Sequence, residues 1–172
     1  MSLKNFSKLF TDLDSSNSSN NKVEVLKSYF LSNEPIDNSW AIYLLTGKSN
    51  KRFVSGRYLK NLFSQVYEYP QWLIDTCYLK VGDSAEVITL LLKNKNYSGN
   101  KKISNITLNQ LLSKTLPDLS KLNEDEKNLE IKRIWEILPE DDHLIFNKIL
   151  TGTFRVGVSI GLITKSIARL IN

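Results

Sequence analysis

The sequence contains few of the residues that tie small proteins together through covalent or metal bonds. Its 172 residues include one cysteine and one histidine. A single cysteine excludes a disulfide framework and fits a reducing cytoplasm, and one Cys with one His cannot form a classical zinc cluster. No apolar run approaches the ~20 residues of a membrane span, and the polar start MSLKNFSKLF is not a signal peptide. We therefore expect a globular protein that is not attached to a membrane.

Catalytic signatures are also missing. The sequence has no P-loop, no Gly-x-Ser-x-Gly, no dinucleotide fingerprint and no His-Glu-x-x-His motif. His143 follows the acids at 140–142, and we interpret it as a partly exposed helix residue beside acids that favour a helix start. Asp83 is expected to cap another helix. The sequence thus predicts neither a catalytic nor a metal site.

The hydrophobic pattern predicts an all-α fold. Alternation typical of strands never persists beyond four or five residues, whereas apolar residues recur at helical spacing along nearly the whole chain. Helices are expected at about 3–13, 19–31, 35–46, 55–67, 70–81, 83–92, 108–114, 123–138, 139–150 and from 159 to the end. The polar stretch 94–104 is expected to be an exposed loop between two helical halves, near 1–93 and 105–172.

Positive and negative charges are segregated along the chain. The net charge is +5, and the stretches 46–60, 87–117 and 143–172 contain no acid. Nine of the 18 acids lie between Asp118 and Asp142. Such segregation favours a molecule with one basic and one acidic face, as in proteins that bind phosphate backbones, although lysines clustered by chance would give the same pattern.

One phrase occurs twice in the sequence. Residues 44–62 read LLTGKSNKRFVSGRYLKNL and residues 149–167 read ILTGTFRVGVSIGLITKSI. In each copy an apolar helix ends in Leu-Thr-Gly, a loop with basic residues follows, and a Val-Ser pair precedes a second helix. Glycine favours the left-handed end of a helix, and serine is a preferred N-cap. Both copies therefore predict a helix, a basic loop and a second helix whose N-terminus faces an anion.

The basic loops are the best candidate binding sites. Lys48, Lys51 and Arg52 lie in the first loop and Arg155 in the second, all near glycines that let a backbone approach closely. Base-edge reading would need polar side chains on a helix ready for the major groove. Because the polar groups here lie in loops and caps, the pattern favours phosphate contacts without sequence preference.

Several motifs resemble the N-terminal DNA-binding domain of ATP-dependent DNA ligases, most of all the bacterial repair-type enzymes. They are Trp40-Ala-Ile-Tyr-Leu-Leu-Thr-Gly47, Pro70-Gln-Trp-Leu73, Cys77-Tyr78, Val81-Gly-Asp-Ser-Ala-Glu86 and Phe146-Asn-Lys-Ile-Leu-Thr-Gly-Thr-Phe-Arg-Val-Gly-Val-Ser159. The resemblance covers essentially the whole chain, and the last motif is its most specific part.

The resemblance implies an all-α domain of two pseudo-symmetric halves that grips nicked double-stranded DNA across the minor groove. It also implies adenylation and OB-fold domains as partners, ATP and Mg as the cofactors of the full-length ligase but none in this chain, a monomer, and a cytoplasmic, nucleoid-associated location in a bacterium. The residues expected to contact DNA are Lys22, Gly47, Lys48, Lys51, Arg52, Ser55, Arg155, Gly157, Ser159 and Lys165.

The sequence departs from the ligase pattern in one respect. Ligases form a lysyl-adenylate on a Lys-x-Asp-Gly motif, and no such tetrapeptide occurs in these 172 residues. The chain ends shortly before that domain would begin, so we expect that it neither adenylates nor seals DNA alone. A helical scaffold whose basic face binds an acidic partner protein is the alternative interpretation.

Overall fold

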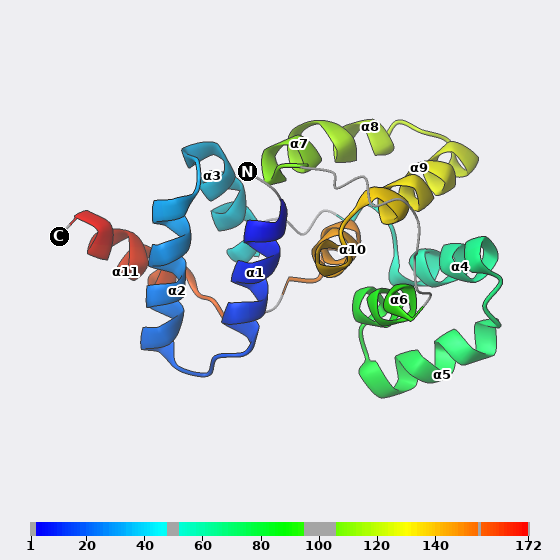
Figure 1. The fold of residues 1–172 in the computed structure, drawn as a ribbon, viewed down its shortest axis with the longest axis horizontal. Helices are drawn as coiled ribbons and strands as arrows, with labels where there is room; N and C mark the ends of the chain where they lie inside the picture. Colours follow the sequence, from blue (N-terminus) through cyan, green and yellow to red (C-terminus); the bar gives the residue numbers. More distant parts are fainter. Residues whose placement is uncertain (1–2, 48–51, 95–105, 155, 172) are drawn as a thin grey trace. The chain divides into compact units, whose positions relative to one another are not determined.

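The part of the chain that the structure describes folds mainly into helices (Figure 1). The computed structural model describes residues 3–47, 52–94, 106–154 and 156–171, and within these ranges it contains no strand, which confirms the all-α prediction. No helix in these ranges combines the length and apolar character needed to cross a membrane. The elements are α1 (Leu3–Asp14), α2 (Ser19–Ser32), α3 (Pro35–Leu45), α4 (Gly56–Tyr67), α5 (Gln71–Val81), α6 (Ser84–Lys93), α7 (Leu108–Gln110), η1 (Leu111–Thr115), α8 (Leu116–Leu119), α9 (Glu124–Ile137), η2 (Glu140–Asp142), α10 (His143–Thr151) and α11 (Ile160–Ile171).

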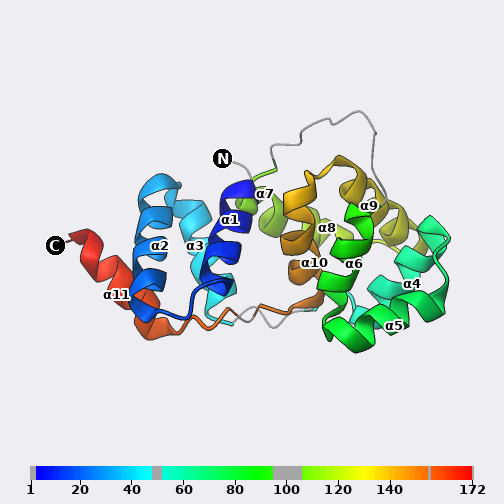
Figure 2. The same cartoon turned by 60° about the horizontal axis from the view of Figure 1, so that its bottom comes forward.

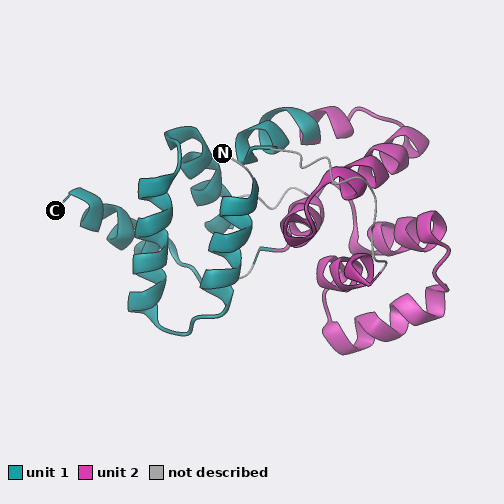
Figure 3. Cartoon of the chain, in the orientation of Figure 1, with its two compact units in different colours: residues 1–50, 105–115, 154–172 teal, residues 51–104, 116–153 magenta. Residues whose placement is uncertain are grey.

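The chain divides into two compact units that alternate along the sequence (Figure 3). Unit 1 comprises residues 1–50, 105–115 and 154–172, and unit 2 comprises residues 51–104 and 116–153. The chain therefore passes between the units within both loops of the doubled phrase. These units differ from the sequential halves predicted near 1–93 and 105–172, and the pseudo-symmetry of those halves stays a prediction.

Unit 1 is built around α1 and α2, which lie beside each other in both ribbon views (Figures 1 and 2). Helix α1 buries Phe6 and Phe10, and the ring of Phe154 lies 6.2 Å from the first and 5.8 Å from the second. The segment that follows α10 is thereby packed onto the core of unit 1. Helix α11 packs along α2, where Arg169 forms an ion pair with Glu24.

Unit 2 has an aromatic core with a buried polar centre. Phe63 and Trp135 are both 2% exposed or less, and their ring centroids lie 6.2 Å apart. The fully buried Asn147 accepts a hydrogen bond from the Trp135 indole at 2.8 Å and donates to the Thr89 hydroxyl at 3.1 Å. These bonds join α9, α10 and α6. They stabilise the arrangement of the three helices, because a buried polar group that loses its partner is costly.

Two helix boundaries differ from those expected. Helical turns continue from α7 through η1, a π-turn, into α8, so the chain is helical through Pro117 and up to Leu119, whereas the expected helix ended near residue 114. Pro117 has no N–H, and its ring would clash with the Ser113 carbonyl in a regular α-helix; the π-turn directly precedes it. The expected single helix over 139–150 is a 3-10 turn followed by α10. The predicted loop over 94–104 falls almost wholly outside the described residues.

The prediction that His143 is partly exposed is wrong. Its side chain is 7% exposed and donates from Nε2 to the Trp135 carbonyl at 2.8 Å, while Nδ1 is buried without a partner. Burial lowers the pKa of His143, and the neighbouring Lys93 lowers it further, against the opposing effects of the Trp135 hydrogen bond and Glu140. The tertiary packing that buries His143 therefore favours the neutral imidazole over the charged one.

The polar centre of unit 2 predicts a large effect for Asn147→Ala. The substitution leaves the buried Trp135 N–H without its acceptor and removes the donor to the Thr89 hydroxyl, which keeps its bond to the Ala85 carbonyl. The loss should lower the free energy of unfolding by about 1–3 kcal/mol. Urea denaturation measures the change. The control is Asn61→Ala on the exposed face of α4, expected within about 0.5 kcal/mol of the wild type. Equal stability of the two variants would contradict the network.

The buried imidazole predicts a pH dependence of stability. The folded-state pKa of His143 lies below its unfolded value, so the unfolded state binds the proton more readily and stability falls as pH drops through about 6.5. We expect a lower free energy of unfolding at pH 5.5 than at pH 7.5. His143→Gln, which keeps an N–H donor but does not titrate, should reduce this difference; an unchanged difference in that variant would rule out His143 as its source.

Candidate nucleic-acid interface

Both Leu-Thr-Gly segments end a helix in the same way. Gly47 follows the end of α3 and Gly152 follows the end of α10, and each has a φ of +69°. The Gly47 amide donates to the Leu44 carbonyl at 3.2 Å, and the Gly152 amide donates to Ile149 at 3.3 Å. A left-handed residue without a Cβ closes the last turn at little cost. The predicted glycine ends of both helices are confirmed.

The end of α10 is also hydrogen-bonded to the first copy of the phrase. The amides of Phe53 and Val54 both donate to the Leu150 carbonyl, at 3.0 and 3.1 Å. Thr153 donates to the Lys148 carbonyl at 3.1 Å and completes a Schellman-type ending around Gly152. Within unit 2, the residues that lead into α4 are therefore held by the carbonyl of the second Leu-Thr-Gly segment. Sequence reasoning missed this contact, because nothing local signals a pairing across about 97 residues.

The serine of each Val-Ser pair caps the following helix. Ser55 accepts a hydrogen bond from the Tyr58 amide at 3.1 Å at the start of α4, and Ser159 accepts one from the Leu162 amide at 3.3 Å at the start of α11. Both serines are exposed. The predicted caps are confirmed, and each presents to solvent a helix N-terminus, which carries a partial positive charge.

The glycines near these helix starts have different roles. A Cβ on Gly56 would lie 2.6 Å from the Ser84 Oγ, so Gly56 is explained by close packing of the α4 start on the α6 start. Gly157 is exposed and has a φ of +60°. A Cβ on Gly161 would make only an ordinary contact, 3.7 Å from the Ser159 Oγ. A Cβ on Gly157 would lie 3.0 Å from the Lys22 Nζ, so Gly157 is explained by its turn and by the packing of Lys22, as Gly56 is by the packing of Ser84.

Lys22, expected to touch a phosphate, is buried in unit 1. Its side chain leaves the first turns of α2, and the ammonium donates to the carbonyls of Val156 and Gly157, at 2.6 and 3.3 Å. The residue is 9% exposed. Lys22 is thus beside the predicted binding loop, but its donors are directed at the backbone of that loop.

The predicted DNA-contact residues that the structure describes are divided between the two units. Unit 1 holds Lys22, Gly47, Gly157, Ser159 and Lys165, and unit 2 holds Arg52 and Ser55. Lys165 is exposed on α11, where its ammonium contacts the Asn20 side chain at 3.4 Å, and Arg52 is exposed. Lys48, Lys51 and Arg155 lie outside the described residues.

The acids of the Val81–Glu86 motif are engaged in structural bonds. Asp83 caps α6 by accepting from the Glu86 amide at 3.1 Å, as predicted. The Lys148 ammonium, 8% exposed, lies 3.1 Å from the Asp83 carboxylate and 2.6 Å from that of Glu86. This ion pair was not predicted. It joins α10 to the start of α6. It also neutralises Lys148, which is one of the basic residues of the acid-free stretch 143–172.

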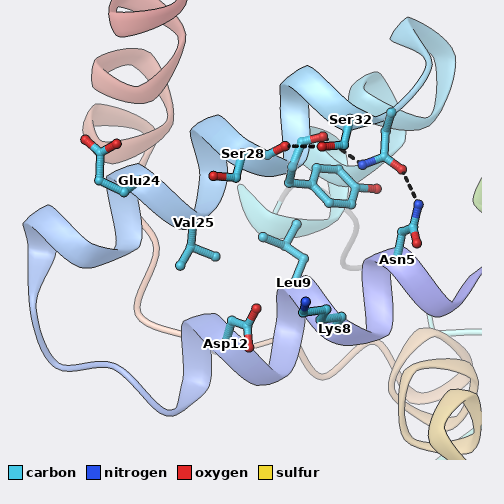
Figure 4. A pocket seen from close by; sticks show the side chains of 10 residues that line it. Asn5, Lys8, Leu9, Asp12, Glu24, Val25, Ser28 and Ser32 are labelled. Atoms are coloured by element: carbon cyan, nitrogen blue, oxygen red, sulfur yellow. Dashed lines mark hydrogen bonds between the residues drawn. The ribbon is translucent and has the colours of Figure 1, made fainter.

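A groove of about 440 Å³ lies between α1 and α2 in unit 1 (Figure 4). Its polar groups bond to one another: Asn5 donates to Asn33 at 2.9 Å, and Ser32 donates to the Ser28 carbonyl at 2.7 Å. Lys8 shares the groove with two carboxylates, Asp12 and Glu24, an environment unsuited to an anion. Among the described residues, no three His, Cys, Asp or Glu side chains gather to hold a metal ion.

Comparison with known proteins agrees with the motifs. The family described as "DNA ligase N terminus" matches residues 2–168, nearly the whole chain. A comparison with curated proteins finds no match. The matched range contains both Leu-Thr-Gly segments, both serine-capped helices and the basic loops between them. The chain belongs to the family of N-terminal domains of ATP-dependent DNA ligases.

Proposed function

We propose that this chain binds duplex DNA without sequence preference, through phosphate and minor-groove contacts, and positions nicked DNA for an ATP-dependent DNA ligase. The adenylation and OB-fold domains of that ligase would be its partners. Membership of the DNA ligase N-terminal family supports a role within such an enzyme. The mode of binding, the monomeric state, the use of ATP and Mg by the full-length enzyme and the bacterial, nucleoid-associated location are part of the proposal.

One observation carries the proposal: the same anion-facing geometry occurs twice. In each copy a left-handed glycine ends a helix and an exposed serine caps the next one. Both copies lie in sequence stretches that contain no acid. A helix N-terminus with free amides and nearby basic side chains favours phosphate oxygens. Such contacts carry no base information, so they support binding without sequence preference.

The predicted residues have distinct roles under this proposal. Ser55 and Ser159 present the N-terminal amides of α4 and α11, while Gly47 and Gly157 let the backbone approach the duplex. Arg52, before the start of α4, and Lys165, in the middle of α11, are both exposed and add positive charge to the two helices. Lys48, Lys51 and Arg155 are proposed from the sequence as further phosphate contacts.

The proposal predicts binding that weakens steeply with salt. A nicked duplex of mixed sequence, titrated by fluorescence anisotropy between 50 and 200 mM salt, should give a negative slope of log K against log salt. Each neutralised phosphate contributes about −0.9 to that slope, because binding releases condensed counterions. A second duplex of unrelated sequence should bind equally. Absent binding at low salt, or binding that ignores salt, contradicts the proposal.

Removing charge from the loops should lower both the affinity and the slope. We expect Arg155→Ala combined with Lys51→Ala to make the slope less negative by about 1.8, if each residue contacts one phosphate. Lys121→Ala combined with Lys132→Ala removes the same two charges from the acidic stretch, where these lysines pair with Asp118 and Glu136, and should leave the slope unchanged. Equal effects of the loop and control substitutions, or tighter binding to an acidic polypeptide than to duplex DNA, would favour the acidic-partner alternative.

A further inference from the structure

Lys22 is placed unusually for a lysine. It is 9% exposed, and its ammonium lies 2.6 Å from the Val156 carbonyl and 3.3 Å from that of Gly157. A lysine is rarely buried unless its charge is paired or its donors are satisfied. Here the acceptors are two successive carbonyls of the loop that leads into α11, about 134 residues away in the sequence.

The bonds of Lys22 set the direction of two backbone amides. In a planar trans peptide the C=O and the N–H point in opposite directions. The carbonyls of Val156 and Gly157 are turned toward the Lys22 ammonium, so the N–H groups of Gly157 and Val158 point away from it. Neither N–H donates a hydrogen bond to any of the described residues. Backbone N–H groups of this kind, two residues or fewer before the exposed Ser159 cap, can bind an anion.

Gly157 and Lys22 fit each other closely. Gly157 has a φ of +60°, a conformation that side chains other than glycine rarely adopt. A Cβ at this position would also lie 3.0 Å from the Lys22 Nζ. The glycine therefore permits both the turn of the loop and the approach of the ammonium to its carbonyls.

We propose that Lys22 is a positioning residue for the DNA-contact loop: its buried ammonium holds the Val156 and Gly157 carbonyls so that the next two amides and the start of α11 face the phosphate. The identity of the ligand rests on the proposed function; the positioning itself does not. Lys22 acts through the loop and contacts no phosphate, which replaces the direct contact expected from the sequence.

The first test needs no DNA. Lys22→Met keeps most of the length of the side chain and removes its donors. Lys27→Met removes the same charge from the same helix, at a residue that forms no hydrogen bond with the described part of the loop. In ¹H–¹⁵N spectra of the whole chain, Lys22→Met should shift the Gly157 and Val158 amides, and Lys27→Met should leave them in place. Unchanged amides in Lys22→Met, or equal shifts in both variants, overturn the proposal.

The second test measures binding to a nicked duplex. We expect Lys22→Met to weaken binding by about tenfold, since charge-assisted hydrogen bonds of this kind orient the loop, and Lys27→Met to weaken it far less. If Lys22 contacts a phosphate directly, its substitution changes the salt slope by about 0.9 without moving the loop amides, and the proposal fails. If the wild type binds no duplex, the proposed function fails while the amide test still decides the role of Lys22.

A second variant covers the case in which Lys22→Met does not fold. Gly157→Ala keeps the charge of Lys22 but places a Cβ 3.0 Å from its ammonium, in a strained backbone conformation. It should shift the Val158 amide and weaken DNA binding with little change in the salt slope. Wild-type affinity and an unmoved Val158 amide in this variant would contradict the proposal.

Discussion

The structure depends on satisfying the backbone groups where its helices end. Each helix leaves carbonyls at its C-terminus and amides at its N-terminus without partners inside the helix. Distant residues hold carbonyls at the end of α10 and in the loop after it: Phe53 and Val54 donate to Leu150 in unit 2, and Lys22 donates to the loop residues Val156 and Gly157 in unit 1. Ser55 and Ser159 then accept the Tyr58 and Leu162 amides, and under the proposal the other first-turn amides of α4 and α11 face the phosphate.

The same constraint separates structural cations from those available to a ligand. Lys148 belongs to an acid-free stretch of the sequence and Lys22 was expected to bind a phosphate, yet Lys148 is paired with Asp83 and Glu86 and Lys22 is bound to carbonyls. Exposed cations such as Arg52 and Lys165 are different, because their charge reaches solvent. A count of basic residues therefore overstates the charge that a DNA phosphate would meet.

Local features were predictable because a few neighbouring residues decide them. The left-handed Gly47 and Gly152, the caps by Ser55 and Ser159 and the all-α fold follow from conformational preference and hydrophobic period. The burial of His143 and the helical path through Pro117 were not predictable, because packing against distant segments overrode the local pattern. The interleaving of the two units along the chain also has no local signal.

The sequence by itself determined the helices, the two glycine-ended and serine-capped loops, and the DNA ligase N-terminal family to which the chain belongs. These depend on residue type and short spacing, which the order of amino acids states directly. Only the tertiary structure decided which cations are buried and which carbonyls they hold, because such contacts join residues about 60 to 135 positions apart. Lys22 shows the difference: its sequence position suggests a phosphate contact, whereas its hydrogen bonds are to the loop backbone.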